Sequence, residues 1–113
     1  MRLDLRRITF FTGNMAAMTA FYRDVIGLEI VTDEPGWKDF AAGNCHISLH
    51  RGKPRIGARA PKIAFYAADI AAARAALVAR GATTFGKVIA MGYFARCEAT
   101  DPDGNAVSIS SRP

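Results

Sequence analysis

Apolar and polar residues alternate with a period of two in several short stretches of the chain, as in strands with one buried face. Two longer stretches instead repeat apolar residues every three or four positions, as on one face of a helix. The helices are expected to begin after Asn14 and Asp69 and to end at Gly27 and Gly81. The expected strands cover residues 3–11, 28–32, 37–41, 45–50, 62–66, 83–89, 94–99 and 105–110.

The two helical stretches divide the chain into similar halves of roughly 55 residues, each with the order strand, helix, strand, strand, strand. Residues 8–11 correspond to residues 63–66, and residues 47–49 to residues 107–109. One small sheet with one helix buries too little apolar surface to be stable alone. We therefore predict an α+β fold in which two βαβββ repeats form a curved mixed sheet, with helices on one face and a concave cleft on the other. The repeats cover about 1–51 and 62–113, joined by a linker at 52–61, within a single domain of residues 1–113.

The strongest local signal is the stretch from Asp101 to Asn105, Asp-Pro-Asp-Gly-Asn. Pro102 suits the second position of a type I turn, the side chain of Asp101 accepts backbone N–H groups, and Gly104 adopts a positive φ easily. This pattern predicts an antiparallel hairpin between residues 93–100 and 105–110.

The period of two assigns the strand residues to the two sheet faces. Residues expected to face the helices are Ile8, Phe10, Ile47, Leu49, Ile63, Phe65, Ala95, Cys97, Ala99, Val107 and Ile109. Residues expected to face the cleft are Arg7, Thr9, Phe11, His46, Ser48, His50, Lys62, Ala64, Tyr66, Phe94, Arg96, Glu98, Ser108 and Ser110. The aromatic residues Phe11, Trp37, Tyr66 and Phe94 either form an apolar floor for a planar ligand or fill the interior of the domain or of a dimer, and the sequence leaves both readings open.

The composition and charge of the chain bear on whether it binds nucleic acid, contains disulfides or spans a membrane. The chain has 15 Lys and Arg against 10 Asp and Glu, with the basic excess gathered in residues 51–62. No aromatic residue interrupts this run, so we interpret it as a solvated linker rather than a segment that binds nucleic acid. Two cysteines are too few for a disulfide framework, and the N-terminus shows no signal peptide. No apolar run is long enough to span a membrane, and we expect a cytoplasmic protein.

Three motifs resemble those of the vicinal oxygen chelate superfamily, which includes glyoxalase I, extradiol dioxygenases, and fosfomycin- and bleomycin-resistance proteins. They are residues 21–29 (FYRDVIGLE), residues 62–65 (KIAF) followed by Asp69-Ile70, and residues 101–105 (DPDGN). The resemblance covers nearly the whole chain and implies the fold predicted above. It also implies a homodimer, because the family usually pairs its subunits.

The family's enzymes bind a divalent metal through a His or Gln at the start of each first strand and a Glu or His in each last strand. The corresponding positions here are Arg7, Ser48, Lys62 and Ser108. Arginine has no acceptor atom, lysine repels a cation, and serine is a weak ligand. We therefore predict no metal and no cofactor at these positions.

The leading hypothesis is a small-molecule-binding protein that holds an anionic or aromatic ligand in the cleft without a metal. The predicted ligand-binding residues are Arg7, Phe11, His46, Ser48, Lys62, Tyr66, Arg96, Glu98 and Ser108. In this hypothesis Arg7 and Lys62 hold the ligand's oxygens, because Arg donates two hydrogen bonds at once.

Two alternatives keep the same fold. The first is a metal-dependent lyase or dioxygenase whose ligands have moved to His46, His50 or Glu98. The two histidines lie four residues apart, roughly 13 Å along an extended strand, which is too far for one ion. The second is a metal-free catalyst that uses Glu98 or His46 as a general base, although the sequence shows no partner for either at a telling spacing.

Overall fold

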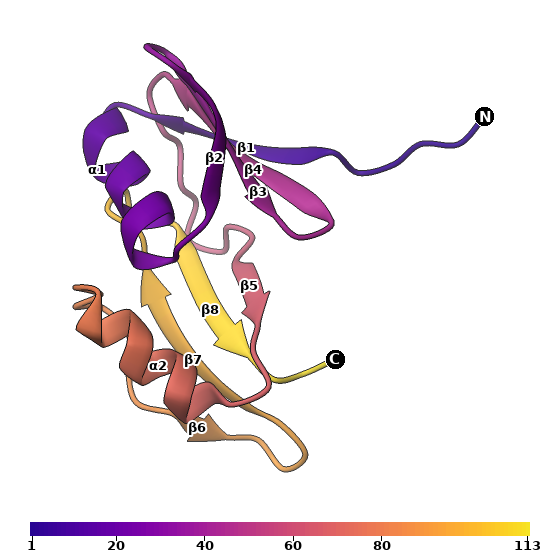
Figure 1. The fold of residues 1–113 in the computed structure, drawn as a ribbon, viewed down its shortest axis with the longest axis vertical. Helices are drawn as coiled ribbons and strands as arrows, with labels where there is room; N and C mark the ends of the chain where they lie inside the picture. The colour runs from indigo at the N-terminus through magenta and orange to yellow at the C-terminus, as the bar shows by residue number, and fades with distance from the viewer. The chain divides into compact units, whose positions relative to one another are not determined.

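The computed structural model describes residues 1–113, which form two compact units, Met1–Arg55 (unit 1) and Ile56–Pro113 (unit 2). In each unit a helix packs against a four-stranded mixed sheet (Figure 1). The order strand, helix, three strands occurs in both, which confirms the predicted α+β fold of two βαβββ repeats. Each repeat forms a sheet of its own.

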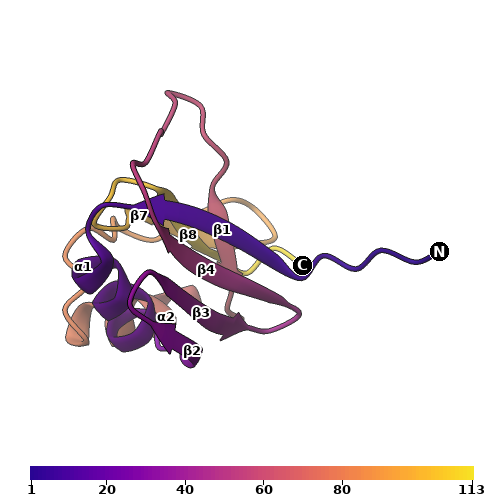
Figure 2. The same cartoon turned by 90° about the horizontal axis from the view of Figure 1, so that it is seen from above.

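Unit 1 has the strand order β1-β4-β3-β2, with β1 parallel to β4 and the other pairs antiparallel. Figure 2 shows these strands side by side with α1 against one face. The helix α1 continues into a π-helical turn, η1, which the sequence pattern did not predict. The elements are β1 (Arg7–Thr12), α1 (Met15–Ala20), η1 (Phe21–Val25), β2 (Glu29–Glu34), β3 (Trp37–Ala42) and β4 (Cys45–Arg51).

Unit 2 has the matching strand order β5-β8-β7-β6, again with its first and last strands parallel. The elements are β5 (Ile63–Tyr66), α2 (Ile70–Ala79), β6 (Ile89–Ala90), β7 (Ala95–Thr100) and β8 (Ala106–Ser110). No helix in either unit has the length and apolar character needed to cross a membrane.

The core of each unit lies between the helix and the sheet, as the apolar pattern predicts. In unit 1, Met18, Tyr22, Phe40 and Leu49 are fully buried, and the rings of Tyr22 and Phe40 lie 6.2 Å apart. In unit 2 the buried residues include Ile70, Leu77, Phe85, Cys97, Val107 and Ile109. This packing leaves the opposite face of each sheet to polar side chains.

The hairpin predicted at residues 101–105 is confirmed. The N–H of Gly104 donates to the carbonyl of Asp101 at 2.9 Å, and Gly104 has a φ of 91°. The carboxylate of Asp101 accepts backbone N–H groups from Asp103 and Asn105 and the side-chain amide of Asn105. β7 and β8 then pair with Cys97 opposite Ile109 and Glu98 opposite Ser108.

Some predicted strand ends are wrong, because a strand needs a partner along its whole length. Residues 3–6 are exposed and form no strand, since β4, the only neighbour of β1, begins at Cys45. The predicted strand at 83–89 shrinks to β6, two residues long. Before β6, the hydroxyl of Thr84 bonds to the backbone of Thr100, in place of a regular ladder.

Two side-chain predictions are also wrong. Asn14 stands at the N-cap of α1, but its side chain makes no capping bond, and its N–H donates to the hydroxyl of Thr12. Asp69, by contrast, caps α2 by accepting the N–H of Ala72 at 3.0 Å. Val78, which the helical repeat of apolar residues places on the buried face of α2, is exposed. Ile8 stands opposite the buried Ile47, on its predicted face, but is partly open to solvent because β1 is an edge strand.

Candidate functional site

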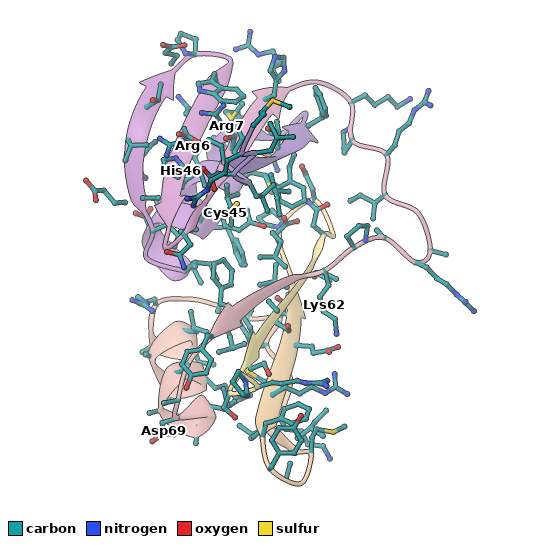
Figure 3. The ribbon with its side chains drawn as sticks, turned by 90° about the vertical axis from the view of Figure 1, so that its right-hand side faces the viewer. Arg6, Arg7, Cys45, His46, Lys62 and Asp69 are labelled. Carbon is teal, nitrogen blue, oxygen red and sulfur yellow. The ribbon has the colours of Figure 1, made fainter.

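Four polar side chains meet on the face of the unit 1 sheet that turns away from α1. The register places Arg7 of β1 opposite His46 of β4, and Ser48 of β4 opposite Asp39 of β3. Figure 3 shows Arg7 and His46 side by side. The period of two in β3 points Asp39 to this face while Phe40 enters the core.

Asp39 is the centre of this polar cluster. Its side chain is buried, with 6% of its surface exposed, and both carboxylate oxygens have partners. The hydroxyl of the fully buried Ser48 donates to Oδ1 at 2.6 Å, and Nδ1 of His46 lies 2.7 Å from Oδ2. The guanidinium Nε of Arg7 lies 3.8 Å from Oδ1. The cluster is therefore a buried carboxylate held by a hydroxyl, an imidazole and a guanidinium.

The surroundings of Asp39 decide its charge. Burial is the largest single influence and would raise its pKa, because a carboxylate loses solvation in the interior. The hydrogen bonds from Ser48 and His46, with the charges of His46 and Arg7, outweigh burial and lower the pKa of Asp39 below its usual 3.8. Asp39 is therefore a carboxylate at neutral pH.

An aromatic row borders the cluster on the same face. The ring of Trp37 lies 5.5 Å below the guanidinium carbon of Arg7, a cation–π contact. The ring of His50 lies 6.1 Å from Trp37 and 5.2 Å from the exposed Phe11. Arg7 thus joins the polar cluster to the aromatic row, and 42% of its side-chain surface remains exposed.

The corresponding face of unit 2 carries a second ionic cluster. Nζ of Lys62 donates to Oε1 of Glu98 at 2.8 Å, and Arg96 donates to the same oxygen. The hydrogen bond from Lys62, followed by the charges of Lys62 and Arg96, lowers the pKa of Glu98. Ser108, opposite Glu98, is buried like Ser48. These side chains are more exposed than those around Asp39.

The two faces follow one plan. In each repeat a cation at the start of the first strand faces a carboxylate on the third strand, and that carboxylate stands opposite a buried serine on the last strand. The sets are Arg7, Asp39 and Ser48 in unit 1, and Lys62, Glu98 and Ser108 in unit 2.

The residues at the family's metal positions do not fit a divalent cation. Arg7 and Lys62 offer no lone pair and already face carboxylates. The hydroxyl of Ser48 donates a hydrogen bond to Asp39. No group of three or more His, Cys, Asp or Glu side chains in the chain is arranged to hold a metal ion.

The structure brings four of the predicted site residues together in unit 1, along with one important neighbour, Asp39, that the sequence did not predict. Arg7, Phe11, His46 and Ser48 share one face, where Asp39 and Trp37 join them. Asp39 was missed as a site residue, although its place next to the apolar Phe40 would have assigned it to the cleft side.

The remaining predicted residues lie in unit 2. Lys62, Arg96 and Glu98 are in contact, Ser108 is buried beside them in the sheet, and Tyr66 is exposed at the end of β5. Phe94 packs under the guanidinium of Arg112 at 5.3 Å. Phe11 and Tyr66 therefore do not fill the interior of their units.

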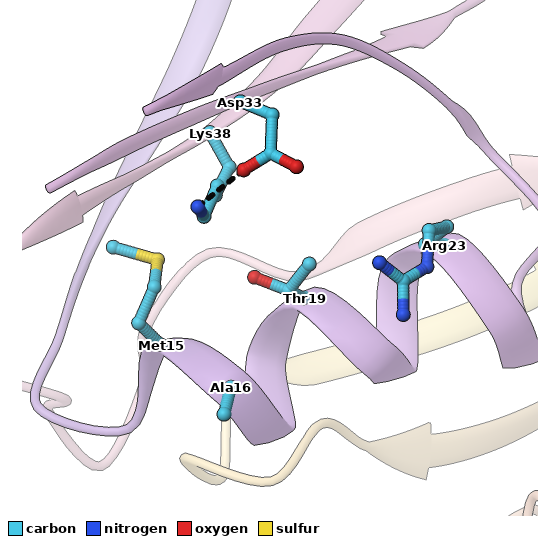
Figure 4. A pocket seen from close by; sticks show the side chains of 6 residues that line it. All are labelled: Met15, Ala16, Thr19, Arg23, Asp33 and Lys38. Atoms are coloured by element: carbon cyan, nitrogen blue, oxygen red, sulfur yellow. Dashed lines mark hydrogen bonds and ion pairs between the residues drawn. The ribbon is translucent and has the colours of Figure 1, made fainter. Parts of the chain in front are cut away.

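A hollow of about 420 Å³ lies on the other side of the unit 1 sheet, between α1 and the strands β2 and β3 (Figure 4). Lys38 and Asp33, at its rim, pair with each other, and Arg23 pairs with Asp24. The buried hydroxyl of Thr19 has no hydrogen-bond partner. Because no aromatic residue lines the hollow, it offers no stacking surface like that of the Asp39 face, and we judge it a weaker candidate.

Comparisons with known proteins match this architecture. The family model "Glyoxalase/Bleomycin resistance protein/Dioxygenase superfamily" matches residues 4–109, which confirms the resemblance seen in the motifs. A comparison with curated proteins finds no match.

Solved structures show the same fold at low sequence identity. A lactoylglutathione lyase from Agrobacterium tumefaciens is 24% identical, with a TM-score of 0.75 over 97% of this chain and 94% of its own. TnmS3, an antibiotic binding protein from Streptomyces sp. CB03234, is 19% identical, with a TM-score of 0.78 over 96% and 94%. UcmS2 is 16% identical, with a TM-score of 0.81 over 99% and 100%. At these identities the likeness shows the fold alone.

Proposed function

Because the chain belongs to the glyoxalase/bleomycin resistance protein/dioxygenase superfamily, we propose that it binds a small aromatic anion, without a metal, on the Asp39 face of unit 1. The observation that carries this proposal is the position of Arg7, stacked on Trp37 and half exposed. The N–H groups of Arg7 bind the anionic group of the ligand, and the aromatic row supports its ring.

The chemistry of the face supports an aromatic anion over other ligands. A planar ring stacks on Trp37 and Phe11, while a carboxylate or phenolate receives two hydrogen bonds from one guanidinium. The carboxylate of Asp39 holds Arg7 in place, with its Oδ1 3.8 Å from Nε of Arg7. A solved structure of the same fold is an antibiotic binding protein, which is consistent with ligand binding in this family.

The predicted ligand-binding residues of unit 2, Lys62, Tyr66, Arg96, Glu98 and Ser108, remain part of the proposal. They occupy the face that corresponds to the Asp39 face. We propose that Lys62 binds an anionic group on this unit 2 face in the same way, when that group draws it from Glu98.

Two further parts of the proposal concern the whole protein. We propose a homodimer, as the family usually forms, which sedimentation equilibrium tests directly. We also propose a cytoplasmic location, consistent with the free thiols of Cys45 and Cys97.

Trp37, the only tryptophan of the chain, gives a direct test. Benzoate is titrated into the protein while Trp37 fluorescence and the heat of binding are recorded. Benzamide tests the need for the negative charge, and cyclohexanecarboxylate tests the need for the aromatic ring. We expect saturable quenching by benzoate, with both other compounds binding at least tenfold more weakly.

Arg7→Met is the decisive variant, and Arg80→Met is its matched control, because Arg80 is an exposed arginine at the end of α2. Arg7→Met is expected to weaken benzoate binding at least tenfold, while Arg80→Met leaves it unchanged. Equal affinity in the two variants, or no saturable binding of benzoate, contradicts the proposal.

A further inference from the structure

We propose that His46 is a general base of this face, and that its Nε2 removes a proton from an aromatic ligand bound beside Arg7. Asp39 acts as the positioning residue that makes Nε2 the proton acceptor. This inference rests on the proposed function, because the ligand must first occupy the face of Arg7 and Trp37.

The tautomer of His46 follows from the charge of Asp39. A carboxylate accepts hydrogen bonds and donates none, so the 2.7 Å contact with Oδ2 requires a proton on Nδ1 of His46. In the neutral imidazole, Nε2 then carries the lone pair. A carboxylate behind a histidine orients the ring in this way in many catalytic sites.

The carboxylate is firmly held, which keeps the imidazole in one orientation. The other oxygen of Asp39 accepts the hydroxyl of Ser48 at 2.6 Å, and Ser48 is fully buried in the central strand β4. Asp39 itself lies in the middle of β3, paired on both sides. The side chain of His46 is 15% exposed, so the ring is fixed but still open to a ligand at the surface.

The charges around His46 suit this role. Asp39 of β3 contacts His46, Arg7 of β1 stands directly opposite it in the register, and Glu29 of β2 lies beyond Ala41 in the same cross-strand row. Ala41 of β3 is its other neighbour across the sheet. Asp39 stabilises the imidazolium that forms, and Arg7 stabilises the anion left on the ligand.

The proton transfer balances without a metal or an oxidant. The bond between the ligand and its acidic hydrogen breaks, the proton moves to Nε2, and the electron pair stays on the ligand, whose negative charge lies next to Arg7. Water later takes the proton from Nε2 and restores the base. The substrate class is therefore a planar aromatic molecule with an acidic hydrogen.

The tautomer is measured without a ligand, from the ¹⁵N chemical shifts of the two histidine rings, assigned with His46→Gln. We expect the proton of neutral His46 on Nδ1. In Asp39→Asn, the amide donates to Nδ1 and moves the proton to Nε2. A proton on Nε2 in the unchanged protein overturns the inference, whether or not benzoate binds.

The proton transfer is tested with 5-nitrobenzisoxazole, an aromatic probe whose C–H proton is lost to a base. Its N–O bond then breaks and releases a coloured cyanonitrophenolate. We expect a kcat at least tenfold lower in His46→Gln than in the unchanged protein. Asp39→Asn is expected to lower kcat more than it raises KM, as a positioning role requires.

Glu29→Gln is the control for adventitious carboxylate bases, because Glu29 is exposed at the start of β2. Its rate is expected to equal that of the unchanged protein. A probe reaction as fast in His46→Gln as in the unchanged protein overturns the inference. If that variant still binds benzoate, the proposed function stands while the general base is rejected.

Discussion

At the scale of single residues, Asp39 holds the candidate site together. Its carboxylate satisfies the hydroxyl of Ser48 and the ring of His46, and both would otherwise lose a partner in a buried place. Leaving a buried polar group without its partner costs about 1–3 kcal/mol. The same network therefore supports both the stability of unit 1 and its chemistry.

The first prediction follows from the lowered pKa of Asp39. A group whose pKa is lowered by folding stabilises the protein above its usual pKa, here 3.8, and loses that contribution as the pH falls through the folded-state pKa. We expect Asp39→Asn to lower the free energy of unfolding by about 2 kcal/mol at pH 7. Urea unfolding at several pH values between 7 and 3 measures the difference, which is expected to shrink toward the acid end.

Asp4→Asn is the matched control for this experiment, because Asp4 pairs only with Arg2 and is largely exposed. It is expected to change the unfolding free energy very little at any of these pH values. A pH-independent loss in Asp39→Asn would show that Asp39 acts through packing rather than through its charge.

The second prediction concerns Thr19, whose buried hydroxyl has no partner. Thr19→Val replaces the hydroxyl with a methyl group of nearly the same size and removes an unsatisfied polar atom. We expect the free energy of unfolding to rise by about 1 kcal/mol. Thr84→Val is the comparison, because the hydroxyl of Thr84 bonds to the carbonyl of Thr100 at 2.9 Å, and we expect it to lower stability. A loss of stability in Thr19→Val would contradict this reading of the hollow.

The sequence predicted the face of most site residues but not their partners. The alternation of β4 is local information, so His46 and Ser48 were placed correctly on one side of the sheet. Which residue of β3 stands opposite them depends on the register of β3 against β4, and a single sequence contains no direct signal of that register. The sequence therefore did not predict Asp39 as a site residue. Its position next to the apolar Phe40 indicated only that it faces the cleft side of the sheet.

At the scale of elements, the hairpin of β7 and β8 is the best example of a structure set by its own residues. The carboxylate of Asp101 accepts three hydrogen bonds from residues of the same five-residue turn, and Gly104 has a φ of 91°. Such a turn forms from short-range contacts, which explains why the sequence predicted it correctly.

The third prediction tests the role of Gly104. A side chain at this φ meets the left-handed region that non-glycine residues avoid, at a cost of about 1–2 kcal/mol. We expect Gly104→Ala to lower the free energy of unfolding by about 1 kcal/mol. Gly57→Ala is the control, because Gly57 has open space around it and no positive φ. Equal stabilities of the two variants in urea unfolding would contradict this role.

Elements that depend on distant partners were predicted less well. The stretch 83–89 has β-forming residues. In the structure, however, only Ile89 and Ala90 pair with β7, opposite Arg96 and Ala95 respectively. The π-helical turn Phe21–Val25 follows a continuous apolar stripe, and that stripe looks the same for an α-helix in the sequence.

At the scale of the whole molecule, the two repeats carry the same set of side chains at corresponding positions: a cation, a carboxylate and a buried serine. Each has a cation where the family's enzymes place the first metal ligand. In each, a carboxylate on the third strand of the same repeat pairs with that cation. The internal ion pair gives the cation a partner and leaves no convergent set of lone pairs.

The last prediction concerns divalent metals. A ligand at a hundred times its Kd stabilises a protein by about 2.7 kcal/mol, which corresponds to a rise in Tm of roughly 10 °C for a small domain. We expect 1 mM Mn²⁺, Ni²⁺, Zn²⁺ or Mg²⁺ to shift the Tm by less than about 1 °C after any histidine tag has been removed. EDTA is expected to leave the Tm unchanged.

A shift near 10 °C would instead mean a Kd of about 10 μM or less, and would favour the alternative of a metal-dependent lyase or dioxygenase with relocated ligands. His46→Gln and Glu98→Gln then locate the ion, because these residues are the remaining metal-binding side chains of the two clusters besides Asp39. Loss of the shift in His46→Gln alone would place the ion on the Asp39 face. That result would also remove the general base, since an imidazole nitrogen bound to a metal cannot accept a proton.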